Sequence, residues 1–224
     1  MPIVYLLRHA QSVANVKGIL AGQDDSVELS KEGFRQAQSL IPYLKAINFS
    51  QVYSSPMTRC LQTITPFMGE NPDLRFEVDK KIIEMNYGDW SGEKLSKLSK
   101  DKRWRKIQTN PSTFTFPNGE SFKSMRKRVD LTLSYLVRKK GPILVVTHGD
   151  IIKMMVTSCL DLPIDRFQSF VAEPASLTVI NLKKSKSTIL QSNYKLAESG
   201  VSKFKTNQIG GGDTLASLRQ WWWK

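Results

Sequence analysis

The two histidines of this 224-residue chain each end a short apolar run of the kind that forms a buried strand. His9 ends residues 3–9, and His148 ends residues 143–148 and is followed by a glycine. In an open α/β sheet, ligands bind in the crevice beyond the carboxyl ends of the strands. Histidine changes its charge near neutral pH and can also act as a nucleophile. We therefore expect the two runs to bring two imidazoles to one site, although a histidine beside an apolar run is more often a core residue.

Arg8 precedes His9 and distinguishes this strand end from an ordinary piece of core. A buried guanidinium group is costly unless an anion meets it. The Arg8–His9 pair therefore predicts a carboxylate or a phosphate at the end of the first strand.

The chain is strongly basic, with 33 Lys and Arg residues against 20 Asp and Glu residues and a net charge of +13. Such an excess attracts anions, among them nucleic acid, anionic lipid and phosphorylated metabolites. The basic residues are dense between residues 94 and 140 and again at 183–186. The plainer interpretation is that most of this charge lies on a solvated surface.

The cysteine content and the apolar runs indicate the compartment. Two cysteines, Cys60 and Cys159, argue against a disulfide scaffold and fit a reducing environment. No apolar run approaches the length of a membrane span, and the first residues lack the basic region of a signal peptide. We therefore expect a cytoplasmic protein that does not enter a membrane.

Strand and helix patterns alternate along most of the chain. The expected strands cover residues 3–8, 51–54, 76–83, 143–148, 176–182 and 188–191, and the expected helices cover 30–44, 55–67, 121–140 and 150–160. Ser30 and Ser121 are suited to cap two of these helices. The alternation predicts an α/β three-layer sandwich, a mostly parallel central sheet with helices on both faces. Residues 1–197 are expected to form one catalytic domain, followed by a Gly-rich and then Trp-rich tail over residues 198–224.

Four blocks of sequence together resemble the histidine phosphatase superfamily, the phosphoglycerate-mutase-like proteins. The first block is Leu7-Arg8-His9-Ala10-Gln11-Ser12 with Asn15, and the second is residues 54–63, which include Arg59. The third is Glu84 with residues 87–92, and the fourth is Thr147-His148-Gly149. The blocks occur in the family's order and cover roughly residues 1 to 182, so the resemblance is specific.

This resemblance implies a phosphomonoester hydrolase that works through a phosphohistidine at His9. Arg8 and Arg59 would bind the phosphate, because each guanidinium offers forked donors to two oxygens. His148 would add a donor when protonated. Glu84 would act first as general acid and then as general base.

Further hydrogen bonds to the phosphate are expected from Ser12 and Asn15, although a turn-forming role is an equal alternative for Asn15. The cationic groups at the site would hold a phosphate without a metal ion. Two histidines alone make a poor metal site, and no His/Cys cluster has zinc spacing. We therefore expect neither a metal nor another cofactor, and the expected partner is a small phosphate monoester.

Several departures separate the chain from the glycolytic mutases of the family. Those mutases resemble Arg-His-Gly-x-Ser-x-Trp-Asn, whereas Ala14 replaces the Trp before Asn15 here. They also carry Glu-Arg-x-Tyr-Gly, in which the Arg holds the substrate carboxylate, and Met85 occupies that place. These differences favour a phosphatase over a cofactor-dependent phosphoglycerate mutase or other phosphomutase, which stays the alternative.

A second alternative is a non-catalytic protein that binds anions or nucleic acid on the same fold. No residue of the expected site is missing, and no nucleic-acid motif is recognisable, so nucleic acid is not the expected partner. The basic insertion over residues 94–106 is expected to lie over the pocket mouth and to select anionic substrates. The sequence leaves open the physiological substrate, a homodimeric state and the role of Trp221, Trp222 and Trp223.

Overall fold

The computed structural model describes residues 1–195, so the expected tail over residues 198–224 lies outside the described part of the chain. The strands are β1 (Ile3–Arg8), β2 (Gln51–Ser54), β3 (Phe76–Val78), β4 (Ile143–Thr147), β5 (Leu177–Asn181) and β6 (Thr188–Tyr194). The α-helices are α1 (Val13–Lys17), α2 (Lys31–Ser39), α3 (Ile41–Lys45), α4 (Thr58–Gly69), α5 (Leu95–Leu98), α6 (Trp104–Thr109), α7 (Phe122–Leu136) and α8 (Gly149–Cys159). Short 3₁₀ helices are η1 (Lys80–Ile82), η2 (Gly88–Trp90), η3 (Pro111–Thr113) and η4 (Ile164–Ser169).

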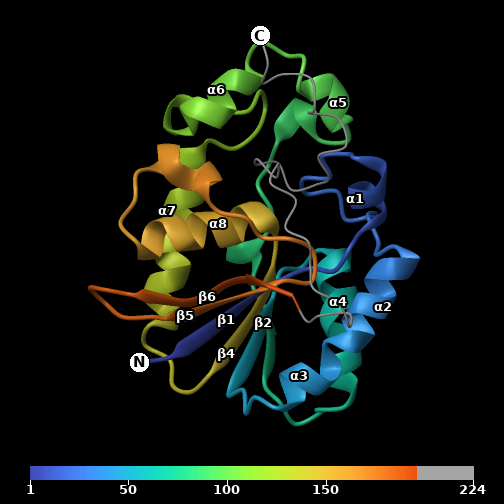
Figure 1. Cartoon of the computed structure of the whole chain (residues 1–224), viewed down its shortest axis with the longest axis vertical. Coiled ribbons are helices and arrows are strands. Elements are labelled where there is room, and N and C mark those ends of the chain that lie inside the picture. The colour runs from blue at the N-terminus through green and yellow to red at the C-terminus, as the bar shows by residue number, and fades with distance from the viewer. Residues whose placement is uncertain (196–224) are drawn as a thin grey trace.

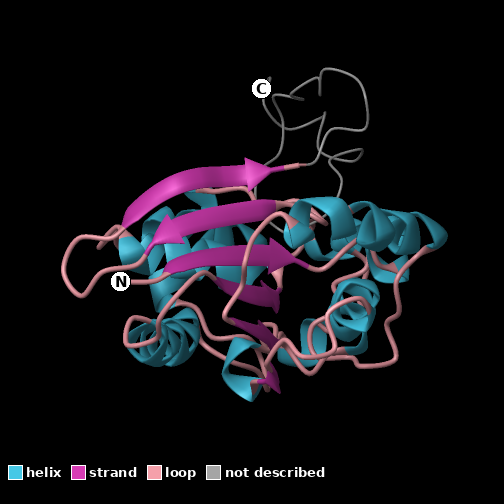
Figure 2. Ribbon diagram, turned by 90° about the horizontal axis from the view of Figure 1, so that it is seen from below, coloured by secondary structure: helices cyan, strands magenta, loops and turns pink. Residues whose placement is uncertain are grey.

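The six strands form one sheet in the order β3-β2-β4-β1-β5-β6. The pairs β2/β3, β2/β4 and β1/β4 are parallel, and β1/β5 and β5/β6 are antiparallel. Successive strands twist relative to one another (Figure 2). The expected mostly parallel sheet is therefore confirmed, and its two antiparallel pairs lie together at the β5–β6 end.

Helices cover both faces of the sheet, as the alternation of elements predicts. Val4 and Leu6 of β1 pack with apolar residues of α7 and α8, whereas Leu7 packs with residues of α3 and α4 on the opposite face. This alternation along one strand follows from the two-residue period of strand side chains. Figure 1 shows α7 and α8 on one side of the sheet and α2, α3 and α4 on the other.

The helix expected over residues 30–44 is in fact two helices. α2 ends at Ser39 and α3 begins at Ile41. Pro42 lies in the first turn of α3 and has no N–H to continue the hydrogen bonds of α2, so the chain starts a new helix there. The expected cap is confirmed, because the Ser30 side chain accepts from the backbone N–H of Gly33.

Gly33 lets α2 approach the loop that follows β1. A β-carbon at this position would collide with the Gln11 carbonyl, so the closest contact of the helix is made by its glycine. Phe34, although apolar and next to Gly33 in the helix, is 46 % exposed. The helix thus packs through Gly33 and Ala37, and it holds the loop that carries the first sequence block.

The strand expected over residues 76–83 is also shorter than expected. β3 ends at Val78, and Asp79 then caps the 3₁₀ helix η1 by accepting from the backbone N–H of Lys81. The remaining expected elements are present with end shifts of a few residues, and Ser121 caps α7 as predicted. Within residues 1–195, no helix is both long enough and apolar enough to cross a membrane.

Candidate active site

The carboxyl ends of β1 and β4 place the two histidines next to each other. The strands are parallel neighbours with Arg8 opposite Thr147, and the His9 backbone N–H donates to the Thr147 carbonyl at 2.9 Å. The centroids of the His9 and His148 rings are 5.3 Å apart. Both histidines are buried. The pairing of the strands therefore brings together two residues that are 139 positions apart in the sequence (148 minus 9).

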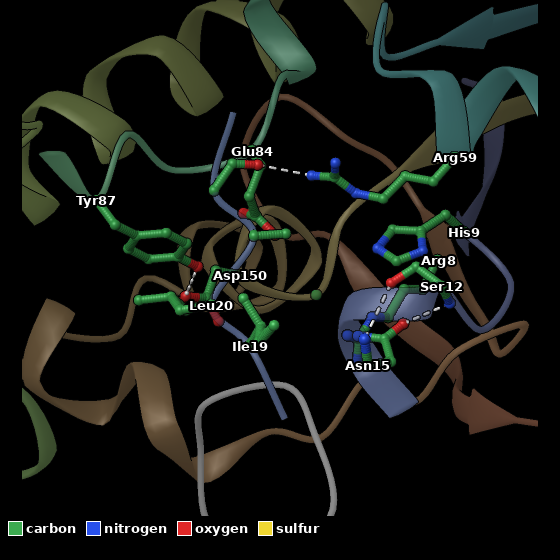
Figure 3. A pocket seen from close by; sticks show the side chains of 13 residues that line it. Arg8, His9, Ser12, Asn15, Ile19, Leu20, Arg59, Glu84, Tyr87 and Asp150 are labelled. Carbon is green, nitrogen blue, oxygen red and sulfur yellow. Dashed lines mark hydrogen bonds between the residues drawn. The ribbon is translucent and has the colours of Figure 1, made fainter. Parts of the chain in front are cut away.

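A pocket opens at this strand end. It is lined by Arg8, His9, Ser12, Asn15, Arg59 and Glu84, and also by residues 19–22, Tyr87, Gly149 and Asp150. Arg8, His9 and Arg59 lie on one side of this pocket, and Glu84, Tyr87 and Asp150 face them (Figure 3). Six of the seven predicted site residues therefore meet in one pocket, and the seventh, His148, is buried behind His9.

His9 is arranged as a nucleophile. Its Nδ1 lies 2.8 Å from the Ala10 carbonyl oxygen, which accepts hydrogen bonds only, so Nδ1 carries the proton and Nε2 holds a lone pair. Burial lowers the pKa of His9 well below its usual value of 6.5, and the positive charges of Arg59 and Arg8 lower it further. The ring is therefore neutral at pH 7, as a nitrogen nucleophile must be.

Arg59 enters the pocket from the first turn of α4. Its Nη2 donates to the Gly22 carbonyl at 2.7 Å and its Nη1 donates to the Asp24 carbonyl at 3.1 Å. Arg8 reaches the same pocket from the last position of β1, and its Nη1 donates to the Ala172 carbonyl at 2.7 Å. Both guanidinium groups are almost completely buried. Two fixed positive charges beside a neutral imidazole form a binding site for an anion.

His148 contacts Arg59 and Ser55. Its Nδ1 lies 3.3 Å from Arg59 Nη2, and its Nε2 lies 2.8 Å from the Ser55 hydroxyl. Since a guanidinium only donates, Nδ1 accepts and Nε2 carries the proton. Burial and the positive charges of Arg59 and Arg8 lower the pKa of His148 well below 6.5. A bound phosphate dianion would raise that pKa again, so a protonated His148 stays a prediction for the occupied site.

Glu84 lies in the irregular segment between η1 and η2. The pKa of its carboxyl group is raised to about 7, chiefly by burial and secondly by the negative charge of Asp150. Glu84 Oε1 accepts from the Met85 backbone N–H at 2.8 Å, and Oε2 lies 3.9 Å from His148 Nδ1. A carboxyl group that is half protonated near pH 7 can both donate and accept a proton there.

Ser12 and Asn15 form a reciprocal cap at the start of α1. The Asn15 backbone N–H donates to the Ser12 hydroxyl at 3.2 Å, and the Ser12 backbone N–H donates to Asn15 Oδ1 at 2.8 Å. The turn-forming role considered for Asn15 is therefore present. Both residues also line the pocket, and the cap leaves the Ser12 hydroxyl proton and the Asn15 amide hydrogens for another acceptor.

Sequence reasoning missed a hydrogen-bonded group of Tyr87, Asp150 and Lys153 across the pocket from His9. The Tyr87 hydroxyl donates to Asp150 Oδ2 at 2.7 Å, and Lys153 Nζ lies 3.4 Å from Asp150 Oδ1. Asp150 could have been found, because it stands in the first turn of a helix that follows the His148 strand. Lys153 gave no such signal, because it is one charge within an apolar helical run and reads as a surface residue.

Two other features of the site bear on its chemistry. Among residues 1–195, no three His, Cys, Asp or Glu side chains are grouped so as to hold a metal ion. The Cys60 thiol lies 3.5 Å from His148 Nε2, and burial raises its pKa to about 12. Cys60 therefore stays protonated at neutral pH and belongs to the packing around His148.

Comparison with known proteins gives one consistent family. Residues 4–195 match the sequence profile of the histidine phosphatase superfamily, branch 1. Phosphoserine phosphatase 1 of Hydrogenobacter thermophilus is 32% identical over 196 residues, which are 84% of this chain and 90% of the relative. A 2,3-bisphosphoglycerate-dependent phosphoglycerate mutase of Thermoplasma acidophilum is 28% identical over 187 residues, which are 82% of this chain and 88% of the relative.

Solved structures show the same fold. A mycobacterial glucosyl-3-phosphoglycerate phosphatase in complex with VO₃ superimposes with a TM-score of 0.78 at 24% identity, over 87% of this chain and 100% of that one. The α-ribazole phosphatase of Shigella flexneri gives a TM-score of 0.75 at 23% identity, over 86% of this chain and 96% of that one. With the profile match over residues 4–195, these findings show that the chain belongs to the histidine phosphatase superfamily.

Proposed function

We propose that this protein is a metal-independent phosphomonoester hydrolase that forms a phosphohistidine at His9. The observation that carries the proposal is the state of His9 in its pocket. The ring is neutral, its Nδ1 is bound to the Ala10 carbonyl, and its free Nε2 shares the pocket with Arg8 and Arg59. The two guanidiniums can neutralise the charge of a phosphate dianion, which is the main task in catalysing phosphoryl transfer.

The reaction proceeds in two steps. In the first, His9 Nε2 attacks phosphorus in line, a P–N bond forms, the ester P–O bond breaks, and Glu84 gives its proton to the departing alkoxide. In the second, water attacks phosphorus and transfers a proton to the Glu84 carboxylate, and the P–N bond breaks to release phosphate. The pKa of about 7 at Glu84 supports both roles. Each turnover consumes one water molecule and restores the enzyme.

Ser12, Asn15 and His148 complete the proposed phosphate site. Ser12 and Asn15 line the pocket and would donate to phosphate oxygens. His148 lies directly behind His9, and it would become a donor when the substrate's charge raises its pKa. The relatives named for phosphoserine and phosphoglycerate make small three-carbon phosphate esters the first substrates to test.

Phosphoglycerate mutase is the second candidate, because mutases are among the relatives. One from Methylobacterium is 32% identical over 169 residues, which are 69% of this chain and 78% of the relative. Against this candidate, Met85 stands where the mutases carry the arginine that holds the substrate carboxylate. Its side chain is completely buried in the core and does not line the pocket. This position therefore offers no positive charge to a phosphoglycerate carboxylate.

The proposal is tested by hydrolysis of 4-nitrophenyl phosphate by the wild type and His9→Ala, both in excess chelator. We expect steady turnover by the wild type and a loss of at least a thousandfold in the variant. Turnover that the chelator abolishes would overturn the metal-independent mechanism. An inert wild type that interconverts phosphoglycerates with a bisphosphoglycerate primer would identify the mutase instead. An inert protein that binds nucleic acid in a salt-dependent manner would identify the binding protein.

A further inference from the structure

Arg128, on α7, divides its guanidinium N–H groups between the Glu120 carboxylate and the segment that carries Glu84. Its Nε and Nη2 donate to the two oxygens of the Glu120 carboxylate at 2.8 and 3.0 Å. Its Nη1 donates to the carbonyl oxygens of Lys81 and Ile83, both at 2.8 Å, and Nη2 also donates to the Glu84 carbonyl at 3.3 Å. A guanidinium has five N–H groups. These five contacts therefore use the full donor capacity of Arg128.

Glu120 binds the same segment on the C-terminal side of Glu84. The Glu120 backbone N–H donates to the Asn86 carbonyl at 2.8 Å, and the Asn86 backbone N–H donates to Glu120 Oε2 at 3.5 Å. Gly119 permits this contact, because a β-carbon there would collide with the Asn86 carbonyl and the Gly88 nitrogen. The turn over residues 117–121 is therefore seated directly on the chain that follows Glu84.

The segment that carries Glu84 needs such support because it has no regular backbone hydrogen bonds of a helix or a strand. Residues 83–87 lie between η1 and η2 and belong to neither a helix nor a strand. The ion pair between Arg128 and Glu120 is mostly buried, with side chains 18% and 14% exposed. Bidentate pairs of this kind fix geometry as well as contribute energy. The main chain on both sides of Glu84 is thus bound by this buried pair, which is formed by α7 and the turn before it. Gln23 Nε2 also donates to the Glu84 carbonyl, at 2.8 Å.

We propose that Arg128 and Glu120 are positioning residues that hold Glu84 at the distance from the leaving oxygen that proton transfer requires. This inference rests on the proposed role of Glu84 as general acid. A displacement of about 1 Å at a reacting group can cost roughly a hundredfold in rate. The cost should appear only where the reaction needs a proton from Glu84.

The test compares two substrates whose leaving groups differ in basicity. An alkyl phosphate such as phosphoserine releases a strongly basic alkoxide, whereas 4-nitrophenyl phosphate releases a phenolate that leaves without protonation. The variants are Arg128→Lys, which keeps the charge but has at most three donors, and Glu120→Gln. Arg126→Lys is the matched control. Arg126 lies on the same helix, is 21% exposed and pairs with Asp130, so it touches neither Glu84 nor Glu120.

We expect Arg128→Lys to lower kcat/KM for the alkyl phosphate roughly ten- to a hundredfold and for 4-nitrophenyl phosphate less than threefold. Arg126→Lys should change neither value by more than twofold. An equal loss on both substrates, or no loss, would overturn the inference. If Arg128→Lys is unfolded at the assay temperature, Glu120→Gln decides by the same criterion.

Glu84→Gln, measured in parallel, separates this inference from the proposed function. Suppose that Glu84→Gln loses kcat/KM selectively for the alkyl phosphate, whereas Arg128→Lys and Glu120→Gln do not. That result refutes the positioning role and leaves the acid role of Glu84 intact. Equal behaviour of Glu84→Gln on both substrates refutes the acid role of Glu84 and the positioning role with it.

Discussion

At the scale of the residue, the site depends on two groups whose pKa values move in opposite directions. Burial and two arginines keep His9 neutral, whereas burial and Asp150 keep Glu84 partly protonated. One group is then ready to attack phosphorus and the other to give up a proton at the same pH. Asp150 is held in place by Tyr87 and Lys153, so its charge is a fixed part of this arrangement.

Removing the charge of Asp150 should shift the pH dependence of the first step. The general acid must be protonated, so kcat/KM should fall as the pH rises above about 7. In Asp150→Asn the pKa of Glu84 loses its second-largest upward contribution, and the fall should move to lower pH. A pH series on phosphoserine, whose alkoxide leaving group needs a proton from Glu84, measures the shift, because ionisation of the substrate is the same for both enzymes. A fall that moves to higher pH would contradict this assignment.

The buried carboxyl of Glu84 should also cost stability at alkaline pH. Its folded pKa of about 7 lies above the ordinary value of 4.5, so its stabilising contribution is complete below pH 4.5 and is lost as the pH rises to 7. Glu84→Gln has no carboxyl group to ionise. Its free energy of unfolding relative to that of the wild type should therefore rise by about 3 kcal/mol between pH 5 and pH 8. Thermal unfolding at both pH values checks it. A difference between the two proteins that is constant with pH would refute the raised pKa.

At the scale of the element, the strands could be predicted because their apolar runs are short and end abruptly. The buried runs that end at His9 and His148 identify β1 and β4, and the order of the four blocks adds Arg59 and Glu84. Pro42 is a local signal for the break between α2 and α3, because it has no backbone N–H to continue the helix. The exposure of Phe34 could not be predicted, because it depends on the tertiary contact of Gly33 with the loop after β1.

The site residues that escaped prediction share a physical reason. Lys153 can be buried because its ammonium group pairs with Asp150 and lies over the ring of Phe167. The apolar run around Lys153 in the sequence indicates neither contact. Arg128 lies among other basic residues at the start of α7 and resembles a solvated charge. Its contacts with Glu120 and the Glu84 segment arise only when the helix packs beside η1.

The basic insertion is joined to the rim of the pocket through one short pairing. Ile19 forms a bridge with Lys94, and Leu20 N–H donates to the Glu93 carbonyl at 2.9 Å. Within the insertion, Lys97 pairs with Glu93 and Arg103 pairs with Asp101. Lys94 is exposed and lies opposite Ile19, which lines the pocket, so it is the residue from which we expect an effect on anionic substrates.

Charge reversal at Lys94 should raise KM for substrates that carry a second anionic group. We expect Lys94→Glu to raise KM for phosphoserine or phosphoglycerate about three- to tenfold at low salt, and less at high salt. Lys184→Glu is the control, because it makes the same change of net charge in the exposed loop between β5 and β6. Equal KM values for Lys94→Glu and Lys184→Glu would show that the insertion does not select substrates.

At the scale of the whole molecule, the net charge of +13 attracts anions of any kind. Specific binding requires a pocket in which positive groups are held in a fixed arrangement. In the proposed function Arg8 and Arg59 form that site, and their guanidiniums are buried where salt screens them little. We therefore expect the surface charge to attract anions and the pocket to decide which of them stay bound.

Anion binding at the pocket should stabilise the folded protein. Inorganic phosphate or vanadate at 100 times its Kd should raise the free energy of unfolding by about 2.7 kcal/mol, and Tm by roughly 5 to 10 °C. Arg59→Gln should lose most of this shift at the same ionic strength. A full shift in Arg59→Gln would place the bound anion elsewhere on the basic surface.

The central claim is that the phosphoryl group passes through His9, and trapping the phosphorylated enzyme tests it most directly. The enzyme is mixed with 4-nitrophenyl phosphate, denatured in alkali within milliseconds, and its peptides are weighed by mass spectrometry. We predict an acid-labile, alkali-stable phosphate on the peptide of His9, absent from His9→Ala and enriched in Glu84→Gln, where hydrolysis of the intermediate lacks its base. Turnover without any phosphate on His9, or with phosphate on another residue, would contradict the account.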